Sequence, residues 1–291
     1  MTQMALPTAD AKTPGVAEEP ILTITARHGW RALNFGEIWE YRGLIWLFAK
    51  RDLTLRYKQT VFGLLWVLLQ PLGMTVVYSI FFGYIARIPS EGVPYPVFLL
   101  GGTILWQSFS RGLGEAGTSL VAQQGLISKI YFARPIVPLS PIISTFFDCG
   151  VMLFLLIGLM LFYGMTPHWS ILLTPIFALM AAVLAYSIGL WLSALDALYR
   201  DVRYALTFLV QFWYFATPVI YPISIVPAKF RFLFLFNPMT GPIEGFRWAV
   251  LGNVTPPDAP TIASSLVITA ILLLTGMMFF RRIERTIIDR I

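Results

Sequence analysis

Long runs of apolar residues, separated by short polar segments, dominate the sequence from residue 61 onward. A helix needs about 20 apolar residues to cross the roughly 30 Å hydrocarbon core of a bilayer. Six runs approach that length, at residues 61–86, 97–121, 136–163, 171–195, 205–221 and 262–280. The runs are continuous, whereas the strands of a membrane barrel alternate apolar and polar positions. The pattern therefore predicts an all-α membrane protein with six transmembrane helices.

The segment before the first run, residues 36–60, mixes apolar and charged positions. Apolar residues recur roughly every three or four positions among acidic and basic ones, and they are Trp39, Leu44, Trp46, Leu47, Phe48 and Leu55. This is typical of an amphipathic helix that lies in the headgroup layer, with its basic residues toward anionic lipid. A soluble helix of a small N-terminal domain is the alternative. The two tryptophans and the adjoining span favour the interfacial helix.

Residues 222–257 are partly apolar but too interrupted to cross a membrane. An apolar run at 230–236 ends at Asn237-Pro238, a helix-breaking dipeptide, and a second apolar piece covers 243–251. We expect these two pieces to form a re-entrant helical hairpin on the outer side, before the last span. Such backbone is tolerated at membrane depth only inside protein or beside a water-filled cavity.

The composition indicates that lipid is the solvent for most of the chain. Of the 291 residues, 57% are hydrophobic and 12% are charged, which is about half the charged share of soluble domains. Residues 61–291 are therefore expected to form one transmembrane domain. Residues 1–35 are polar, lack the apolar core of a signal peptide and predict a disordered cytoplasmic tail, so the spans are expected to direct insertion.

Basic residues flank the runs mainly on one side of the predicted membrane. With the N-terminus in the cytoplasm, only Arg87, Lys229, Arg231 and Arg247 fall outside. The positive-inside rule therefore predicts that both termini are cytoplasmic. This agrees with the six spans, because an even number of spans leaves both termini on the same side. The net charge is +6, and the basic residues lie beside the spans rather than in one stripe. This distribution disfavours nucleic-acid binding. The single Cys149 excludes an intrachain disulfide.

The sequence lacks catalytic and metal-binding motifs. It has no G-x-x-x-x-G-K-[ST], H-E-x-x-H or G-x-S-x-G pattern, and His28 and His168 are isolated, so no catalytic residue, P-loop ATP site or metal site is expected. Three charged residues do fall within the runs. Arg111 and Glu115, spaced i and i+4, are expected to neutralise each other, and Asp148 is expected to be buried or to face a cavity. A proton relay is the alternative, but these groups are too few to cross the membrane.

The segment between the second and third runs, residues 123–141, carries more apolar residues than a cytoplasmic loop needs. Ile127, Ile130 and Phe132 are predicted to form an exposed apolar knob flanked by basic residues. A knob of this kind fits a groove on a partner protein.

Aromatic residues make up 15% of the chain and gather near the outer ends of the runs. One interpretation is the aromatic belt found at lipid interfaces. The other is a conduit whose aromatic walls stack on sugar rings. Its candidate channel residues are Tyr78, Phe81, Phe82, Tyr84, Trp106, Phe212, Trp213, Tyr214, Phe215 and Tyr221. The pattern leaves both interpretations open, but residues 212–215 cover all faces of a helix, so at least one of them is expected to face inward.

Four segments resemble the ABC-2 type permeases that export polysaccharide, O-antigen and teichoic acid. They read RDLTLRYKQTVFGLLWVLLQPL at 51–72, LISKIYFARPIVPLS at 126–140, LYRDVRY at 198–204 and NPMTGPIEGFRWAVL at 237–251. Each resembles the family pattern in both sequence and position. The resemblance extends from about residue 38 to the C-terminus.

The resemblance implies a multi-pass permease of the bacterial inner membrane. Two copies of the chain are expected to form a channel, and two copies of a separate nucleotide-binding subunit are expected to bind ATP and Mg²⁺ and drive transport. No cofactor is expected in this chain. The implied substrate is a polysaccharide carried on a polyprenyl diphosphate lipid. The alternatives are an ABC-2 exporter of a drug or another lipid and a proton-driven flippase.

The resemblance also implies three groups of functional residues. Contact with the ATPase maps onto Leu126, Ile127, Lys129, Ile130, Tyr131, Phe132 and Arg134. The outer gate maps onto Asn237, Pro238, Glu244 and Arg247. The amphipathic helix would lie where substrate enters, and its Arg51, Arg56 and Lys58 are expected to attract the diphosphate by charge-assisted hydrogen bonds.

Overall fold

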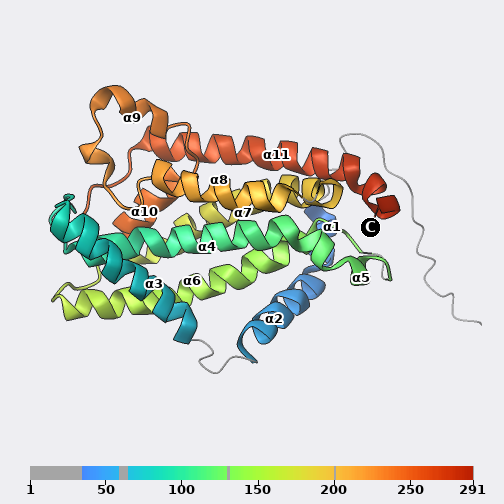
Figure 1. The fold of residues 1–291 in the computed structure, drawn as a ribbon, viewed down its shortest axis with the longest axis horizontal. Coiled ribbons are helices and arrows are strands. Elements are labelled where there is room, and N and C mark those ends of the chain that lie inside the picture. The colour runs from blue at the N-terminus through green and yellow to red at the C-terminus, as the bar shows by residue number, and fades with distance from the viewer. Residues whose placement is uncertain (1–34, 59–64, 130–131, 200, 291) are drawn as a thin grey trace, which may run out of the picture. The chain divides into compact units, whose positions relative to one another are not determined.

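The computed structural model describes residues 35–58, 65–129, 132–199 and 201–290, so the predicted tail lies outside it except for Phe35. Helices and turns, with no strand, make up this part of the chain (Figure 1), which confirms the all-α prediction for it. The α-helices are α1 Phe35–Glu40, α2 Arg42–Lys58, α3 Leu65–Tyr78, α4 Tyr95–Ala122, α5 Gln124–Ile127, α6 Ile136–Phe162, α7 Thr174–Leu198, α8 Val202–Ala216, α9 Ala228–Phe234, α10 Thr240–Leu251 and α11 Ala259–Arg290. The shorter helical turns are η2 Ser79–Ile85, η3 Trp169–Leu173 and η4 Ile223–Ile225.

Among the residues that the structure describes, four helical segments are long and apolar enough to cross a bilayer, which identifies a multi-pass membrane protein. They are Leu65–Ile85, Ile136–Phe162, Trp169–Leu198 and Ala259–Ile283, and they coincide with the first, third, fourth and sixth predicted runs. Residues 61–64 of the first run lie outside the described residues. The second run forms α4, which has 28 residues but carries several polar side chains. The fifth run forms α8, whose 15 residues extend only about 22 Å at 1.5 Å per residue.

The fifth run ends its helix earlier than the apolar pattern predicts. Helix α8 stops at Ala216, and Thr217 adopts extended backbone angles with φ −108° and ψ 142°. Pro218 follows directly, and a proline disfavours the helical conformation of the residue before it. The prediction of a helix as far as residue 221 is therefore wrong.

The helix α4 lies at the centre of the bundle and packs along α6 and α7, while α7 packs along α11 (Figure 1). Small residues allow these backbones to approach closely, as in other membrane helix pairs. A Cβ on Gly189 of α7 would lie 2.9 Å from Cβ of Ala116, and one on Gly276 of α11 would lie 2.7 Å from the carbonyl oxygen of Ser187. The packing therefore leaves no space for larger side chains at these crossings.

The C-terminal end of α3 changes its winding before the chain turns back. The segment η2 is a π-helix, and the Ala86 amide donates to the carbonyl of Phe81, five residues earlier, at 2.9 Å. Glu91 then adopts a positive φ of 55° in the turn before α4. Its carboxylate accepts from the Thr255 amide at 3.0 Å and the Ser224 hydroxyl at 3.1 Å. Glu91 therefore connects its own loop to the loops that contain Ser224 and Thr255.

The predicted amphipathic segment forms two helices rather than one. A turn at Tyr41 separates α1 from α2, and α2 packs against α6. Ile45 and Phe48 of α2 are buried, while Trp46 and Leu55 are exposed. The C-terminal end of α2 reaches Asp148 near the middle of α6, as the ion pairs below show.

Residues 222–257 contain two short helices joined at Asn237-Pro238, where the sequence predicts the break. Helix α9 is largely exposed, whereas α10 is buried against α4 and α7. A Cβ on Gly245 of α10 would lie 2.1 Å from the ring of Phe177 in α7. This contact fixes α10 against the bundle.

Candidate functional site

A network of ionised side chains joins α2, α4 and α6. Arg56 donates to both carboxylate oxygens of Glu115, at 2.8 and 2.6 Å, and also to Asp148. The hydroxyl of Tyr57 donates to the other oxygen of Asp148, whose side chain is almost fully buried. Burial alone would lower the pKa of Arg56, but Glu115 and Asp148 outweigh it and hold that pKa above its usual value. Arg56 is therefore charged and is held by carboxylates from two different helices.

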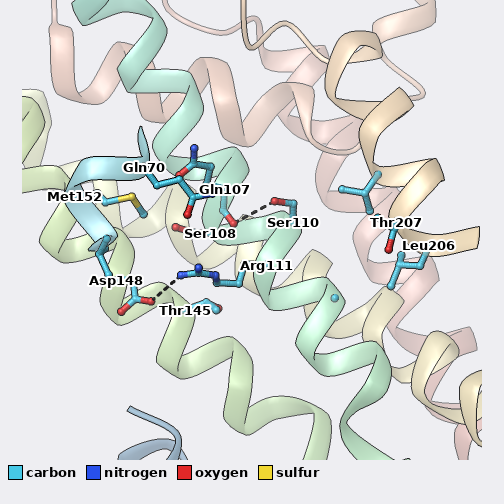
Figure 2. A pocket seen from close by; sticks show the side chains of 13 residues that line it. Gln70, Gln107, Ser108, Ser110, Arg111, Thr145, Asp148, Met152, Leu206 and Thr207 are labelled. Atoms are coloured by element: carbon cyan, nitrogen blue, oxygen red, sulfur yellow. Dashed lines mark hydrogen bonds and ion pairs between the residues drawn. The ribbon is translucent and has the colours of Figure 1, made fainter. Parts of the chain in front are cut away.

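The network corrects one prediction and confirms another. Glu115 pairs with Arg56 rather than with Arg111, because α2 brings a cation closer than the helical neighbour reaches. Arg111 instead lies 3.7 Å from Asp148, as Figure 2 shows. The prediction that Asp148 is buried or faces a cavity is confirmed on both counts, since it is 1% exposed and lines a cleft.

The cleft has a volume of about 380 Å³ and lies between α3, α4, α6 and α8 (Figure 2). Its lining is Val67, Gln70, Gln107, Ser108, Ser110, Arg111, Gly114, Thr145, Asp148, Met152, Leu206, Thr207 and Val210. Side-chain amides, hydroxyls and one ion pair thus face a space enclosed by largely apolar helices. The sequence analysis did not select Gln70 or Gln107. A glutamine within an apolar run is the signal that could have found both.

The other two residues expected to attract a diphosphate lie outside this network. Arg51 pairs with its neighbour Asp52 at 2.9 Å, and Asp52 also accepts from the Ser140 hydroxyl of α6 at 2.6 Å. Lys58, at the end of α2, is exposed. The structure therefore separates an anchoring cation, Arg56, from a cation at the surface.

The predicted apolar knob is not exposed at Phe132. This ring is 4% exposed and meets the ring of Phe48 edge-on, with 5.7 Å between centroids. Phe132 fills the contact between α2 and the start of α6, so the prediction that it projects into water is wrong. An apolar side chain in a short loop can equally well face its own protein, and the sequence gives no signal to separate the two cases.

The remaining predicted coupling residues surround α5. The half-buried members are Leu126, Ile127 and Arg134. Lys129 is exposed. The positions outside the described residues are Ile130 and Tyr131. Their contact with an ATPase remains a prediction.

The turn between α7 and α8 lies at the same end of the bundle as α5 (Figure 1). Buried Asp196 accepts from Arg203 Nε at 3.1 Å and from Nη2 at 3.0 Å. This bidentate pair fixes the turn geometrically. This ion pair is not among the features predicted from the sequence.

The candidate channel aromatics divide into a packed group and an exposed group. Trp106 of α4 lies 6.0 Å from Trp213 and 5.6 Å from Tyr214 of α8, measured between centroids, and Tyr78 of α3 contacts the same cluster. Burial of Tyr214 confirms that one member of 212–215 faces inward. The exposed group is Phe81, Tyr84, Phe212 and Phe215. The packed rings join α3, α4 and α8, and the two remaining candidates, Phe82 and Tyr221, are half-buried. A channel role for the exposed rings remains a prediction.

Arg247 of α10 is buried and reaches the loop that follows α8. Its Nη2 donates to the carbonyls of Pro218 at 3.0 Å and Val219 at 2.7 Å, and its guanidinium lies 3.9 Å from the ring centroid of Phe98. A Cβ on Gly102 would stand 2.3 Å from the same nitrogen, so a glycine is needed there. Arg247 therefore fixes the course of the loop.

Asn237 joins helices α9 and α10 to the end of α8. Its Oδ1 accepts from Trp213 Nε1 at 2.9 Å and from the Met239 amide at 3.1 Å. Its Nδ2 donates to the Thr217 hydroxyl at 2.9 Å. Pro238 beside it is buried, and the half-buried Glu244 follows in α10. The predicted gate residues thus lie in one connected region, while their gating role remains a prediction.

Ionised groups and a polar cleft among apolar helices are features of membrane transport proteins, where such groups mark a path or a moving part. Among the described residues, no cluster of three His, Cys, Asp or Glu side chains is arranged to hold a metal ion.

Comparison with known proteins assigns the class more closely. The chain matches the ABC-2 type transporter family over residues 43–251 and belongs to that family. It is 28% identical to the O-antigen export system permease protein RfbA of Myxococcus xanthus, over 84% of this chain and 94% of that protein. A permease of the same name from Klebsiella pneumoniae is 27% identical, over 86% and 95%. The polysialic acid transport protein KpsM of Escherichia coli is 24% identical, over 82% and 92%. These relatives are transport proteins rather than enzymes.

Proposed function

We propose that this chain is the permease of an ATP-driven exporter that moves lipid-linked polysaccharide across the bacterial inner membrane. The observation that carries the proposal is that polysaccharide-transport relatives match more than 80% of this chain and more than 90% of their own lengths. A likeness over this much of the chain favours a shared transport task over export of a drug or another lipid. The cargo is a glycan on a polyprenyl diphosphate.

The energy for transport comes from a separate nucleotide-binding subunit, of which the exporter contains two copies. The sequence of this chain has no P-loop, so ATP and Mg²⁺ are bound by that partner and this chain carries no cofactor. The partner contacts the segment around α5, from Leu126 to Arg134. The nearby turn held by Asp196 and Arg203 offers a second, stiff contact at the same end of the bundle.

Six spans, with both termini cytoplasmic, fit the arrangement of the helices. In Figure 1, α3, α4, α6, α7, α8 and α11 run alternately in opposite directions along the bundle. Helix α4 runs beside α6 and α7 and counts as the second span. Helix α8 is short for a span, and the loop that follows it, which Arg247 binds, covers the remaining depth of the membrane. The excess of basic residues places the end with α5 and the C-terminus inside. Helix α2 then lies at the cytoplasmic interface, and α9 and α10 form the outer hairpin.

A second copy of the chain completes the channel. The exposed aromatic rings of η2 and α8 provide its wall, and the gate residues around Asn237 and Arg247 close its outer end. Lys58, with Arg51, attracts the diphosphate of the carrier at the cytoplasmic side, while Arg56 anchors α2. This assignment is consistent with the separate contacts of the three cations.

Reconstitution of the chain with its ATPase in proteoliposomes tests the proposal. We expect polyprenyl-diphosphate-linked glycan to stimulate ATP hydrolysis and to appear on the far side, whereas small hydrophobic compounds do neither. The chain alone, without the ATPase, is the control and should transport nothing. Stimulation by the hydrophobic compounds instead would assign a different ABC-2 substrate class. Transport by the chain alone would exclude the ATP-driven mechanism.

A further inference from the structure

Two amides in the cleft have no hydrogen-bond partner within the described part of the chain. The side chains of Gln70 in α3 and Gln107 in α4 both line the space shown in Figure 2. Each amide offers two donors and one acceptor. Leaving such groups against hydrocarbon costs several kcal/mol each. The cleft is therefore expected to open toward water or a polar ligand rather than toward lipid.

The charges around the cleft cancel. Arg56 and Arg111 contribute two positive charges, and Glu115 and Asp148 contribute two negative charges, with each cation within 4.0 Å of a carboxylate. A diphosphate gains little from a cluster that is neutral as a whole, since each cation already has a counter-charge. A neutral ligand rich in hydroxyl groups suits the site better, because hydroxyls both donate to carboxylates and accept from amides and guanidinium.

The size and position of the cleft also suit a sugar. Its volume of about 380 Å³ falls within the roughly 300–1,000 Å³ typical of small-molecule sites. Thr207 of α8 is exposed at its edge, on the same helix as the exposed ring of Phe212. A glycan passing along α3 and α8 would meet this edge.

We propose that the cleft is a binding subsite for the neutral sugar units of the transported glycan, formed by Gln70, Gln107, Ser110, Arg111, Asp148 and Thr207. This inference rests on the proposed export of polysaccharide and adds which part of the cargo binds where. The sugar hydroxyls bond the two amides, while the diphosphate binds elsewhere. Asp148 also holds Arg56 and Tyr57 of α2, so an occupant of the cleft touches the carboxylate that anchors this helix.

The first test replaces the two amides by apolar side chains in the full transporter. We expect Gln70→Leu with Gln107→Leu to raise the concentration of polyprenyl-diphosphate-linked glycan that gives half-maximal ATPase stimulation about tenfold, the loss expected for two neutral hydrogen bonds. The matched control is Gln211→Leu, an exposed glutamine of α8 outside the cleft lining, which should change this concentration less than twofold. An unchanged double variant, or an equal effect of Gln211→Leu, overturns the subsite.

The second test does not depend on those variants folding. Thr207→Cys is expected to react with a water-soluble, membrane-impermeant thiol reagent, and glycan-bearing polyprenyl diphosphate should slow the reaction at least threefold. Polyprenyl diphosphate without a glycan should not slow it. Equal protection by the glycan-free lipid shows that the carrier fills the cleft, and an unreactive thiol shows that the cleft is closed to water; either result overturns the subsite. If no glycan lipid stimulates the unmodified transporter, it is the proposed function that fails.

Discussion

Two arginines, Arg56 on α2 and Arg247 on α10, fasten opposite regions of the bundle in different ways. Arg56 is held by carboxylates from two separate helices. Arg247 is held by two consecutive backbone carbonyls and by the face of Phe98. The first arginine therefore joins helices through side chains that can exchange partners. The second fixes the backbone itself.

This difference leads us to expect that α2 can change its contacts, whereas the connection between α8 and α10 keeps one conformation. Carboxylates such as Asp148 can turn to another cation, and Arg111 already lies 3.7 Å away. The carbonyls of Pro218 and Val219 have no such freedom, because the loop is packed under Arg247 and above Gly102. We expect α2 to shift during transport while the α8–α10 connection keeps its form.

The largest effect is expected for Arg247→Met. The change leaves two buried carbonyls without donors and removes the cation from the face of Phe98, which together should lower the free energy of unfolding by about 4 kcal/mol. Thermal unfolding of the detergent-solubilised protein measures the loss. Lys229→Met, which removes an exposed cation from α9, is the matched control and should leave the unfolding temperature nearly unchanged. Equal melting of the two variants would show that Arg247 does not hold the loop.

A double-mutant cycle on Arg56 and Asp148 should show the next largest effect. We expect Arg56→Met and Asp148→Asn to be coupled by about 2 kcal/mol, because both changes remove the same partly buried ion pair, while Glu115 still binds Arg56 and Arg111 still lies near Asp148. The comparison cycle uses Arg51→Met and Asp52→Asn, a more exposed pair on the same helix, with an expected coupling of about 0–1 kcal/mol. Similar coupling in both cycles would contradict the assignment of Arg56 as the anchor of α2.

Gly102→Ala tests the packing beneath Arg247 without removing any polar group. The new methyl would overlap Arg247 Nη2 and lie 3.0 Å from the Val219 carbonyl, so we expect a loss of about 2 kcal/mol from overpacking. Gly114→Ala on the same helix meets no atom within 4 Å and should gain up to about 1 kcal/mol from helix propensity. Opposite signs in the two unfolding experiments are the expected result. A loss at both positions would point to α4 flexibility rather than to contact with the arginine.

The sequence predicts most of the helices because apolar runs of membrane length leave the backbone few alternatives. The break at Asn237-Pro238 and the inward position of one residue in 212–215 also follow from local rules. The end of α8 cannot be predicted from hydropathy. Pro218 is apolar and so continues the apolar run, yet it disfavours the helical conformation of Thr217 and ends the helix.

Partners distant in sequence account for the remaining errors. Glu115 has a suitable cation four residues away, yet it binds Arg56, 59 residues earlier in the chain. Phe132 looks exposed in a short loop, yet it packs on Phe48. In both cases α2 supplies the missing partner, and a pattern along one helix contains no information about a helix that folds back onto it.

The smallest effect concerns Glu244 of α10 and the pH dependence of stability. Burial raises the pKa of Glu244 to about 7 from its usual value near 4.5, with Glu91 and Asp258 adding to the rise and Arg247 opposing it. The folded protein thus favours the protonated acid, so this contribution to stability is complete below pH 4.5 and is lost as the pH rises through 7. We expect the unfolding temperature to fall between pH 5 and pH 8 in a way that Glu244→Gln removes. The effect is on the order of 1 kcal/mol, because the side chain is only half-buried. If the Glu244→Gln variant keeps the full pH dependence, another group titrates. The connection between α8 and α10 would then be stabilised by the hydrogen bonds of Arg247 and Asn237 and not by Glu244.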